Sequence, residues 1–201
     1  MVGVLGIQGS FSLHLRALAR LGLAPRLVKR AADLDGCDRL ILPGGESTVL
    51  SKFLGETGLF EVIRARARAN DLALFGTCAG AILIGREPAR GPGERPPPGC
   101  QPARLALADV EVRRNAYGRQ IESFRTSIDV LGIAEDGRPV PFEAVFIRAP
   151  RFSALGPGVQ VLASLDRDEP VLVRDGRFLL AAFHPELTDD TVIHRYFIER
   201  T

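Results

Sequence analysis

The segment around Cys78 constrains the fold more than any other part of this chain. An apolar run at residues 72–75 leads directly into Gly76-Thr77-Cys78-Ala79-Gly80 and then into a helix-like stretch at 81–84. Small residues on both sides permit a sharp strand-to-helix turn that presents the central side chain beyond the end of a sheet. A thiol there lies at a helix N-terminus, whose partial positive charge favours the thiolate. The segment predicts an α/β protein with a nucleophilic cysteine; the alternative is a buried structural cysteine.

Strand-like and helix-like segments alternate through the first half of the chain. Apolar runs and helical spacings predict strands at residues 2–7, 27–28, 39–42 and 72–75, and helices at 10–21 and at 48–69 with an interruption near 55–58. Strands that alternate with helices form parallel sheets, whose sites gather beyond the carboxyl ends of the strands. We therefore expect an α/β three-layer sandwich, flavodoxin-like, with a mostly parallel central sheet flanked by helices.

The second half of the sequence has a different character. Six prolines fall between residues 87 and 102, so we expect a surface loop at about 88–102. Its length favours a tolerated insertion over the alternative of a functional loop. Shorter β-like segments follow at residues 107–112, 128–131, 144–147, 160–163, 171–173 and 178–183. A closing helix is predicted at 188–199, with Thr188 as its N-cap and Asp189 and Asp190 in its first turn. We find no internal repeat and no linker, and expect one domain over residues 1–201.

Composition excludes several classes of protein. The 26 basic and 24 acidic residues give a formal net charge of only +2, so no nucleic-acid partner is implied. No run approaches the roughly 18 uninterrupted apolar residues of a membrane-spanning helix. Cys37, Cys78 and Cys100 stand at wide, unpaired spacing, which favours a reducing cytoplasm over a disulfide framework. Spacings typical of a metal cluster, a phosphate loop or a dinucleotide site are missing, so we expect neither metal nor cofactor.

A candidate general base follows the apolar run near the C-terminus. In the extended segment Phe183-His184-Pro185-Glu186, residues two apart project to the same side, so His184 and Glu186 point together. A carboxylate beside an imidazole fixes its tautomer and stabilises the imidazolium that forms when the ring takes a proton from a thiol. The alternative is a turn with a solvated histidine. His14 and His194 lie on helical patterns without such a partner, and we expect both on the surface.

A third segment, Leu42-Pro43-Gly44-Gly45-Glu46-Ser47, ends another strand. Consecutive glycines let backbone N–H groups turn toward a ligand and form an anion-binding nest. Acyl transfer needs such donors where the tetrahedral oxyanion develops, and the amide of Ala79, directly after the nucleophile, is a second candidate beside that of Gly45. The alternative is a plain turn in which Ser47 caps the next helix.

Together, the turn at 43–47, the elbow at 76–80 and the segment Phe-His-Pro-Glu-Leu-Thr at 183–188 resemble the class I, triad-type glutamine amidotransferases. Within that class, three further motifs resemble the glutaminase subunits of pyridoxal 5′-phosphate synthase. They are Leu5-Gly6-Ile7-Gln8-Gly9, Arg114-Asn115-Ala116-Tyr117-Gly118-Arg119-Gln120 and Val145-Phe146-Ile147-Arg148-Ala149-Pro150. These motifs extend over nearly the whole chain, whereas the proline-rich stretch is longer than the family pattern.

The resemblance implies hydrolysis of L-glutamine to glutamate and ammonia, and delivery of the ammonia to a partner synthase subunit. It implies Cys78 as nucleophile, His184 as general base and then acid, and Glu186 as orienting carboxylate. Gly45, Glu46 and Ser47 are expected to line the glutamine and oxyanion site, and Arg114, Ile147 and Arg148 to hold the α-amino-acid end of the substrate. It also implies slow hydrolysis until the synthase docks, because the Gly44-Gly45 peptide must reorient before an N–H faces the oxyanion.

Two alternatives to this reading stay open at the level of sequence. One is the amidotransferase subunit of another pathway, such as imidazole glycerol phosphate synthesis, which the elbow and the His-Pro-Glu segment do not exclude. The other is a non-catalytic scaffold of the same fold, for which one triad member is expected to be missing. Cys78, His184 and Glu186 are all present. The stoichiometry of a complex, the course of an ammonia tunnel and the roles of Cys37 and Cys100 are left undetermined.

Overall fold

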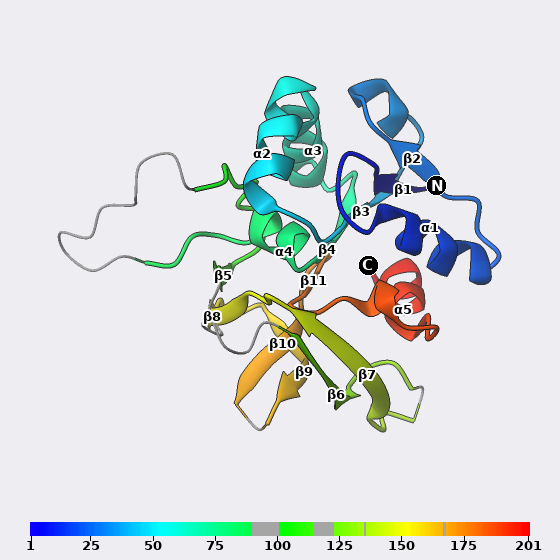
Figure 1. Ribbon diagram of the computed structural model, residues 1–201, viewed down its shortest axis with the longest axis vertical. Helices are drawn as coiled ribbons and strands as arrows, with labels where there is room; N and C mark the ends of the chain where they lie inside the picture. The colour runs from blue at the N-terminus through cyan, green and yellow to red at the C-terminus, as the bar shows by residue number, and fades with distance from the viewer. Residues whose placement is uncertain (90–100, 115–122, 135, 167) are drawn as a thin grey trace.

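A seven-stranded sheet, in the order β2-β1-β3-β4-β11-β10-β9, forms the centre of the computed structural model in the part of the chain that it describes (Figure 1). The described residues are 1–89, 101–114, 123–134, 136–166 and 168–201. The parallel strands are β1 (Val2–Leu5), β2 (Arg26–Val28), β3 (Arg39–Leu42), β4 (Ala73–Thr77) and β11 (Phe178–Ala181). Antiparallel strands β10 (Glu169–Asp175) and β9 (Gln160–Leu165) complete one edge.

Helices cover both faces of this sheet (Figure 1). On one side lie α1 (Phe11–Arg20) and α5 (Val192–Arg200), and on the other lie α2 (Ser47–Glu56), α3 (Leu59–Arg68) and α4 (Ala79–Ile84). Short 3₁₀ helices occur at η1 (Ala31–Leu34) and η2 (Pro185–Leu187). The predicted three-layer α/β sandwich with a mostly parallel sheet is confirmed, as is the break between the two helices predicted within residues 48–69. Among the described residues, every helix is too short or too polar to cross a membrane.

Two small antiparallel sheets extend the second half of the chain. One pairs β5 (Val110–Arg113) with β8 (Arg151–Leu155), and the other pairs β6 (Ser123–Val130) with β7 (Val140–Ile147). In β6, buried Ile128 and Val130 alternate with exposed polar residues, whereas all five residues of β4 are buried. A strand with one solvent-facing side carries a weaker apolar signal than one covered on both faces. For this reason the predicted strands at 128–131 and 144–147 were too short and β8 was missed.

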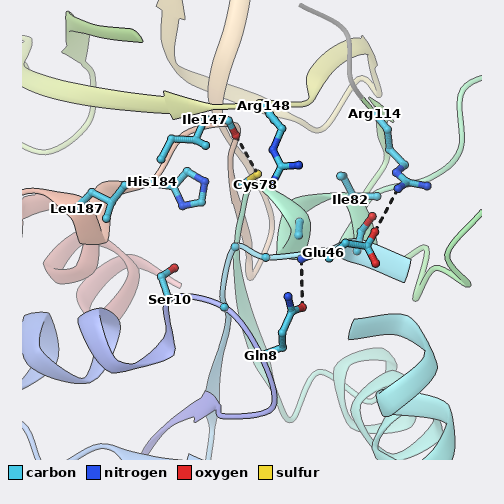
Figure 2. A pocket seen from close by; sticks show the side chains of 15 residues that line it. Gln8, Ser10, Glu46, Cys78, Ile82, Arg114, Ile147, Arg148, His184 and Leu187 are labelled. Carbon is cyan, nitrogen blue, oxygen red and sulfur yellow. Dashed lines mark hydrogen bonds and ion pairs between the residues drawn. The ribbon is translucent and has the colours of Figure 1, made fainter. Parts of the chain in front are cut away.

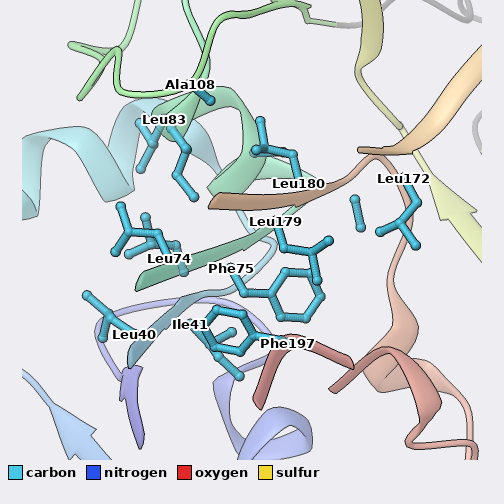
Figure 3. Packing of buried hydrophobic residues seen from close by; sticks show 14 of the residues in the cluster. Leu40, Ile41, Leu74, Phe75, Leu83, Ala108, Leu172, Leu179, Leu180 and Phe197 are labelled. Atoms are coloured by element: carbon cyan, nitrogen blue, oxygen red, sulfur yellow. The ribbon is translucent and has the colours of Figure 1, made fainter. Parts of the chain in front are cut away.

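The core lies between the sheet and its helices (Figure 3). Phe75 of β4 packs against Phe197 of α5, with ring centroids 5.4 Å apart. Leu74 and Leu179, on neighbouring strands, are completely buried as well. This continuous apolar packing makes the central strands a rigid support for the turns at their ends.

The register of the sheet brings three turns to one edge. Leu42 of β3 pairs with Gly76 of β4, and Thr77 of β4 pairs with Ala181 of β11. Because these three strands are parallel and adjacent, their carboxyl ends lie side by side. The glycine turn after β3, the Cys78 elbow after β4 and the His184 segment after β11 therefore meet in one place.

Two predictions in this region are wrong. The last helix begins at Val192, not at residue 188, because η2 turns the chain after His184 and the Thr188 hydroxyl donates to the Pro185 carbonyl oxygen instead of capping a helix. His14 and His194, predicted on the surface, are completely buried, since each lies on the face of its helix that packs against the sheet.

Two predicted features lie outside the described residues. They are the greater part of the proline-rich loop, residues 90–100 with Cys100, and residues 115–120 of the motif that begins at Arg114.

Candidate active site

The three turns surround a pocket of about 510 Å³ at the carboxyl edge of the sheet (Figure 2). Every residue predicted for catalysis, oxyanion stabilisation or substrate binding lines this pocket except Glu186, which is buried behind it. The predicted lining residues are Gly45, Glu46, Ser47, Cys78, Ala79, Arg114, Ile147, Arg148 and His184. The structure thus brings together residues that are up to 139 positions apart, from Gly45 to His184.

Cys78 occupies the apex of a strained elbow between β4 and α4. Its φ of 49° and ψ of −101° are rare for a residue with a side chain, and its N–H donates to the Ala181 carbonyl oxygen at 2.9 Å. A Cβ on Gly76 would lie 2.5 Å from the Gly80 carbonyl carbon, and a Cβ on Gly80 would lie 1.9 Å from the Leu42 carbonyl oxygen. Both flanking positions therefore require glycine. The Cys78 thiol itself faces the pocket, 3.8 Å from the Ile147 carbonyl oxygen.

His184 and Glu186 form a buried pair beside the thiol. The His184 Nδ1 lies 2.8 Å from Glu186 Oε1, which also accepts a hydrogen bond from the Ser10 hydroxyl. The His184 N–H donates to the Val145 carbonyl oxygen at 2.8 Å, which fixes the start of the segment on β7. With Nδ1 engaged by the carboxylate, Nε2 is the ring nitrogen left for the thiol. His184 and Glu186 thus meet as the sequence predicts, although Pro185–Leu187 forms the 3₁₀ helix η2 and not the extended chain from which the prediction was made. Their roles as base and orienting carboxylate stay predictions.

Electrostatics in this pair favour the charged forms. Burial opposes a charged ring, yet hydrogen bonds to Cys78 and Glu186 raise the pKa of His184 from 6.5 to about 10. Burial likewise opposes a charged carboxylate, but the neighbouring His14 and His184 lower the pKa of Glu186 to about 2. Near neutral pH the pair is an imidazolium and a carboxylate, and an imidazolium is the partner that stabilises a cysteine thiolate.

The glycine turn after β3 packs directly against the imidazole. A Cβ on Gly44 would lie 2.3 Å from His184 Cε1, so only glycine fits there. The Gly44 N–H donates to Thr77 Oγ1 at 3.0 Å, and its carbonyl oxygen accepts from the Ser10 N–H at 3.3 Å. The Glu46 N–H donates to Gln8 Oε1 at 3.1 Å (Figure 2). These bonds set the orientation of the Gly44-Gly45 peptide in this structure.

Charged and polar groups form the other wall of the pocket. Arg114 Nη2 lies 3.5 Å from Glu46 Oε1, and the Arg148 side chain extends beside Cys78 (Figure 2). Glu46 caps α2 by accepting from the N–H groups of Thr48 and Val49. The hydrogen bond from the Thr48 side chain and these two N–H groups lower the pKa of Glu46. Glu46, not Ser47, is thus the cap of this helix.

Sequence reasoning assigned no role to five further residues that line the pocket. They are Gln8, Gly9, Ser10, Ile82 and Leu187. The first three form the turn after β1, which pairs in parallel with β3. Their position directly after a buried parallel strand was the sequence signal that could have placed them at the site. The buried His14 was also missed, although it lies three residues after Phe11 on the apolar face of α1.

This arrangement defines a class of protein. A strained cysteine elbow, an imidazole held by a carboxylate and a glycine turn at the carboxyl edge of a parallel sheet are the features of an α/β acyl-transfer enzyme with a Cys-His-Glu triad. A sequence profile of the SNO glutamine amidotransferase family matches residues 4–201, and the chain belongs to this family.

Known relatives match this chain over almost its full length. The chain is 50% identical to "Pyridoxal 5′-phosphate synthase subunit PdxT" of Thermus thermophilus, covering 99% of this chain and 96% of the relative. It is 47% identical to the protein of the same name from Deinococcus radiodurans, covering 98% and 95%. A solved structure described as a glutamine amidotransferase is 46% identical, with a TM-score of 0.87 over 98% of this chain and 97% of that chain. The structure of PurLQS from Thermotoga maritima, at 16% identity and a TM-score of 0.68, shares the fold.

Proposed function

We propose that this protein hydrolyses L-glutamine to L-glutamate and ammonia and delivers the ammonia to a synthase subunit that makes pyridoxal 5′-phosphate. The observation that carries the proposal is the convergence of Cys78, His184 and Glu186 on one pocket together with the glycine turn. Family membership supports the amidotransferase activity, and the relatives named as synthase subunits support the pathway.

The first half-reaction is acylation of the thiol. The Cys78 thiolate attacks the side-chain amide carbon of glutamine, and the charge that develops on the amide oxygen is stabilised by backbone N–H groups. Gly45 and Ala79, which line the pocket with Cys78, are the proposed donors. His184 then transfers its proton to the departing nitrogen, so ammonia leaves and a glutamyl thioester remains on Cys78.

The second half-reaction is hydrolysis of the thioester. Having lost its proton to ammonia, His184 takes one from a water molecule, which attacks the thioester carbon. Collapse of the tetrahedral intermediate releases glutamate and restores the thiolate and the imidazolium. Glu186 holds Nδ1 of the ring through both steps, so Nε2 faces the reacting atoms throughout.

The polar wall of the pocket is suited to the amino-acid end of glutamine. Arg148 or Arg114 is suited to the α-carboxylate, because a guanidinium donates two charge-assisted hydrogen bonds in a planar fork. The Ile147 carbonyl oxygen and the Glu46 carboxylate, with Ser47 beside it, are suited to the α-ammonium group. Arg114 already lies 3.5 Å from Glu46, so substrate binding would rearrange this ion pair.

The proposed partners follow from the same function. They are L-glutamine and a synthase subunit in a hetero-oligomeric complex, with no nucleic acid and no membrane. The proposed location is the cytoplasm, in keeping with the unpaired spacing of the cysteines.

The test is release of ammonia from glutamine, measured with and without the cognate synthase subunit. We expect slow hydrolysis by the isolated chain and a gain of about 100-fold on docking, the contribution typical of one oxyanion donor. Pyridoxal 5′-phosphate formed in the same tube from a pentose phosphate and a triose phosphate would identify the pathway.

Two outcomes would contradict the proposal. An unchanged rate on addition of the synthase would oppose the docking-dependent glutaminase. Failure of 6-diazo-5-oxo-norleucine to label Cys78 under any of these conditions would favour the non-catalytic scaffold. Ammonia transfer to an imidazole glycerol phosphate synthase partner instead would identify the other pathway.

A further inference from the structure

Two buried histidines lie directly behind the triad and have no part in the proposed chemistry. His14 on α1 and His194 on α5 are both completely inaccessible to solvent. His14 Nε2 lies 3.4 Å from Glu186 Oε2, and His14 Nδ1 lies 2.9 Å from His194 Nε2. A chain of contacts thus runs from His184 through Glu186 and His14 to His194. Buried polar groups at such a place are costly unless they are hydrogen-bonded.

The two oxygens of Glu186 differ in their partners. Oε1 accepts hydrogen bonds from His184 Nδ1 and from the Ser10 hydroxyl. Oε2 is buried and, among the described residues, has no hydrogen-bond partner. His14 Nε2 lies 3.4 Å from Oε2. A carboxylate accepts only, so this contact is favourable when His14 carries its proton on Nε2.

The contacts of the second histidine fit the same tautomer. With a proton on Nε2 of neutral His14, Nδ1 is an acceptor, and the neighbouring His194 Nε2 must be the donor. His194 Nδ1 then carries a lone pair, and this is the ring nitrogen that has no partner in the described structure. Burial lowers the pKa of His14, and burial together with the neighbouring His14 lowers that of His194 to about 3. Both rings are therefore neutral near pH 7.

His14 also reaches the glycine turn. Its Nε2 lies 3.3 Å from Thr77 Oγ1, which accepts the Gly44 N–H at 3.0 Å. The same ring nitrogen thus lies between the carboxylate that orients His184 and the hydroxyl that holds the turn of the proposed oxyanion site. Phe75 packs edge-on against the ring, with centroids 6.3 Å apart, and fixes its plane.

We propose that His14 is a positioning residue for the triad: as the neutral Nε2–H tautomer, selected by His194, it donates to Thr77 Oγ1 and keeps the protonated edge of its ring against Oε2 of Glu186, 3.4 Å away. It thereby holds the carboxylate in line with His184 and links it to the Gly44 turn. The expected effect on kcat/KM rests on the proposed glutaminase function, whereas the expected tautomer and contacts of His14 do not.

The tautomer is directly measurable in the unmodified protein. The chain contains only three histidines, so ¹⁵N-histidine labelling gives a spectrum in which each ring can be resolved. Assignment uses the His184→Asn and His194→Gln variants. We expect a neutral His14 ring with its proton on Nε2 at neutral pH. A proton on Nδ1 alone, or an imidazolium at neutral pH, would overturn the proposal.

A matched pair of substitutions tests the role. His14→Gln places an amide nitrogen near the position of Nε2 and keeps the donor, whereas His14→Asn reaches only the position of Nδ1 and loses it. We expect His14→Gln to keep kcat/KM in the synthase complex within about 3-fold, and His14→Asn to lose about 10-fold or more. In His14→Asn the alkaline limb of the kcat/KM profile should also move to lower pH, because a displaced Glu186 no longer supports the His184 imidazolium.

A second readout needs neither glutamine nor synthase. The rate at which iodoacetamide alkylates Cys78, followed by mass spectrometry of its peptide, reports the thiolate–imidazolium pair. For His14→Asn this rate should fall at neutral pH relative to its high-pH plateau, while His14→Gln follows the wild type. Equal effects of both substitutions, or a His14→Asn profile identical to the wild type, would overturn the proposal.

Failure of the proposed function is distinguishable from failure of this inference. If the wild type releases no ammonia even with the synthase, the glutaminase proposal fails, while the spectrum and the alkylation profile still decide the role of His14. If His14→Asn does not fold, the pair His194→Gln and His194→Asn tests the same tautomer of His14 through the ring that selects it. Only the first of these keeps a donor near His14 Nδ1, so only the second is expected to disturb the tautomer and the alkylation profile.

Discussion

Cys78, the proposed nucleophile, lies in a strained backbone conformation. A non-glycine residue in such a sparsely populated conformation costs about 1–3 kcal/mol and persists only where the surroundings impose it. Here the Cys78 N–H is bonded to Ala181 on the neighbouring strand, and the Cys78 carbonyl oxygen accepts from Ile82 in α4. The elbow is thus held from both sides, and the thiol is kept at the pocket.

Substitution of this residue separates chemistry from folding. For Cys78→Ala we expect glutamine hydrolysis in the synthase complex to fall by about 10³-fold or more, because no thioester can form. The substitution removes only one sulfur atom from the elbow, so thermal unfolding and binding to the synthase should stay close to the wild type. Cys37→Ala, at a buried cysteine remote from the pocket, is the control and should retain activity. Retained hydrolysis by Cys78→Ala would refute the nucleophile assignment.

At this scale the sequence predicted that Cys78, His184 and Glu186 lie together, and their roles as a triad stay a prediction; it did not predict the buried side chains behind them. Cys78, His184 and Glu186 each follow a recognisable strand, so their chemistry was visible locally. His14 lies on the stripe formed with Phe11, Leu15 and Leu18, which is also the buried face of α1. A polar residue within an apolar stripe indicates a buried hydrogen-bonded group, which is why the prediction that His14 lies on the surface is wrong.

Among the elements, α4 shows how packing dictates sequence. This six-residue helix begins directly after Cys78, and Gly80 in its first turn touches the end of β3. The contact brings the glycine turn after β3 within reach of the Cys78 elbow. A side chain at Gly80 would have to push the Leu42 carbonyl away, and with it the Gly44-Gly45 peptide.

A pair of glycine substitutions tests this contact. Gly80→Ala should destabilise the protein by about 1–3 kcal/mol through overpacking, and a change of 1 kcal/mol corresponds to about 2–4 °C in Tm for a chain of this size. Gly80→Ala should also reduce glutaminase activity by more than the loss of folded protein accounts for. Gly55→Ala, in α2 with nothing within 4 Å of the added methyl group, should be neutral or stabilise by up to about 1 kcal/mol. Thermal unfolding of both variants measures the difference in stability. Equal Tm values for Gly80→Ala and Gly55→Ala would contradict the packing argument.

The C-terminal segment shows where element prediction failed. Residues 188–199 have acceptable helical spacing, yet the helix starts four residues later because Glu186 must enter the core beside His14. The 3₁₀ turn η2 accomplishes this, and Asp190 Oδ1, not Thr188, accepts the N–H of Val192. The position of a helix start depends here on a tertiary contact that no local pattern contains.

For the whole molecule, the buried charges at the sheet edge link stability to pH. Glu186 has a pKa lowered from 4.5 to about 2, so its contribution to stability is full above pH 4.5 and is lost as pH falls toward 2. His184 has a pKa raised from 6.5 to about 10, so its contribution is full below pH 6.5 and is lost as pH rises through 10. The two pH ranges overlap between pH 4.5 and 6.5, where the contribution of Glu186 and His184 to the stability of the fold is therefore greatest.

Glu186→Gln tests this linkage. Removing one partner of a buried pair should destabilise the fold by about 3 kcal/mol near neutral pH. The difference in Tm between wild type and variant should shrink as pH falls from 4.5, because the wild-type carboxylate then becomes protonated. Glu56→Gln, whose carboxylate is mostly exposed beside Lys52, should change Tm little at any pH. A difference that stays constant with pH would contradict the lowered pKa of Glu186.

The amino-acid sequence by itself determined the class of fold, the order of the central elements and the three segments that carry the site, because each depends on residues close together in the chain. One domain over residues 1–201 stays a prediction. Only the tertiary structure decided that His14 and His194 lie behind Glu186, that Arg114 pairs with Glu46, and that α5 begins at Val192. The physical reason is that burial and hydrogen-bond partnership belong to surfaces formed when distant helices and strands pack, and the local spacing of a sequence does not specify which surfaces meet.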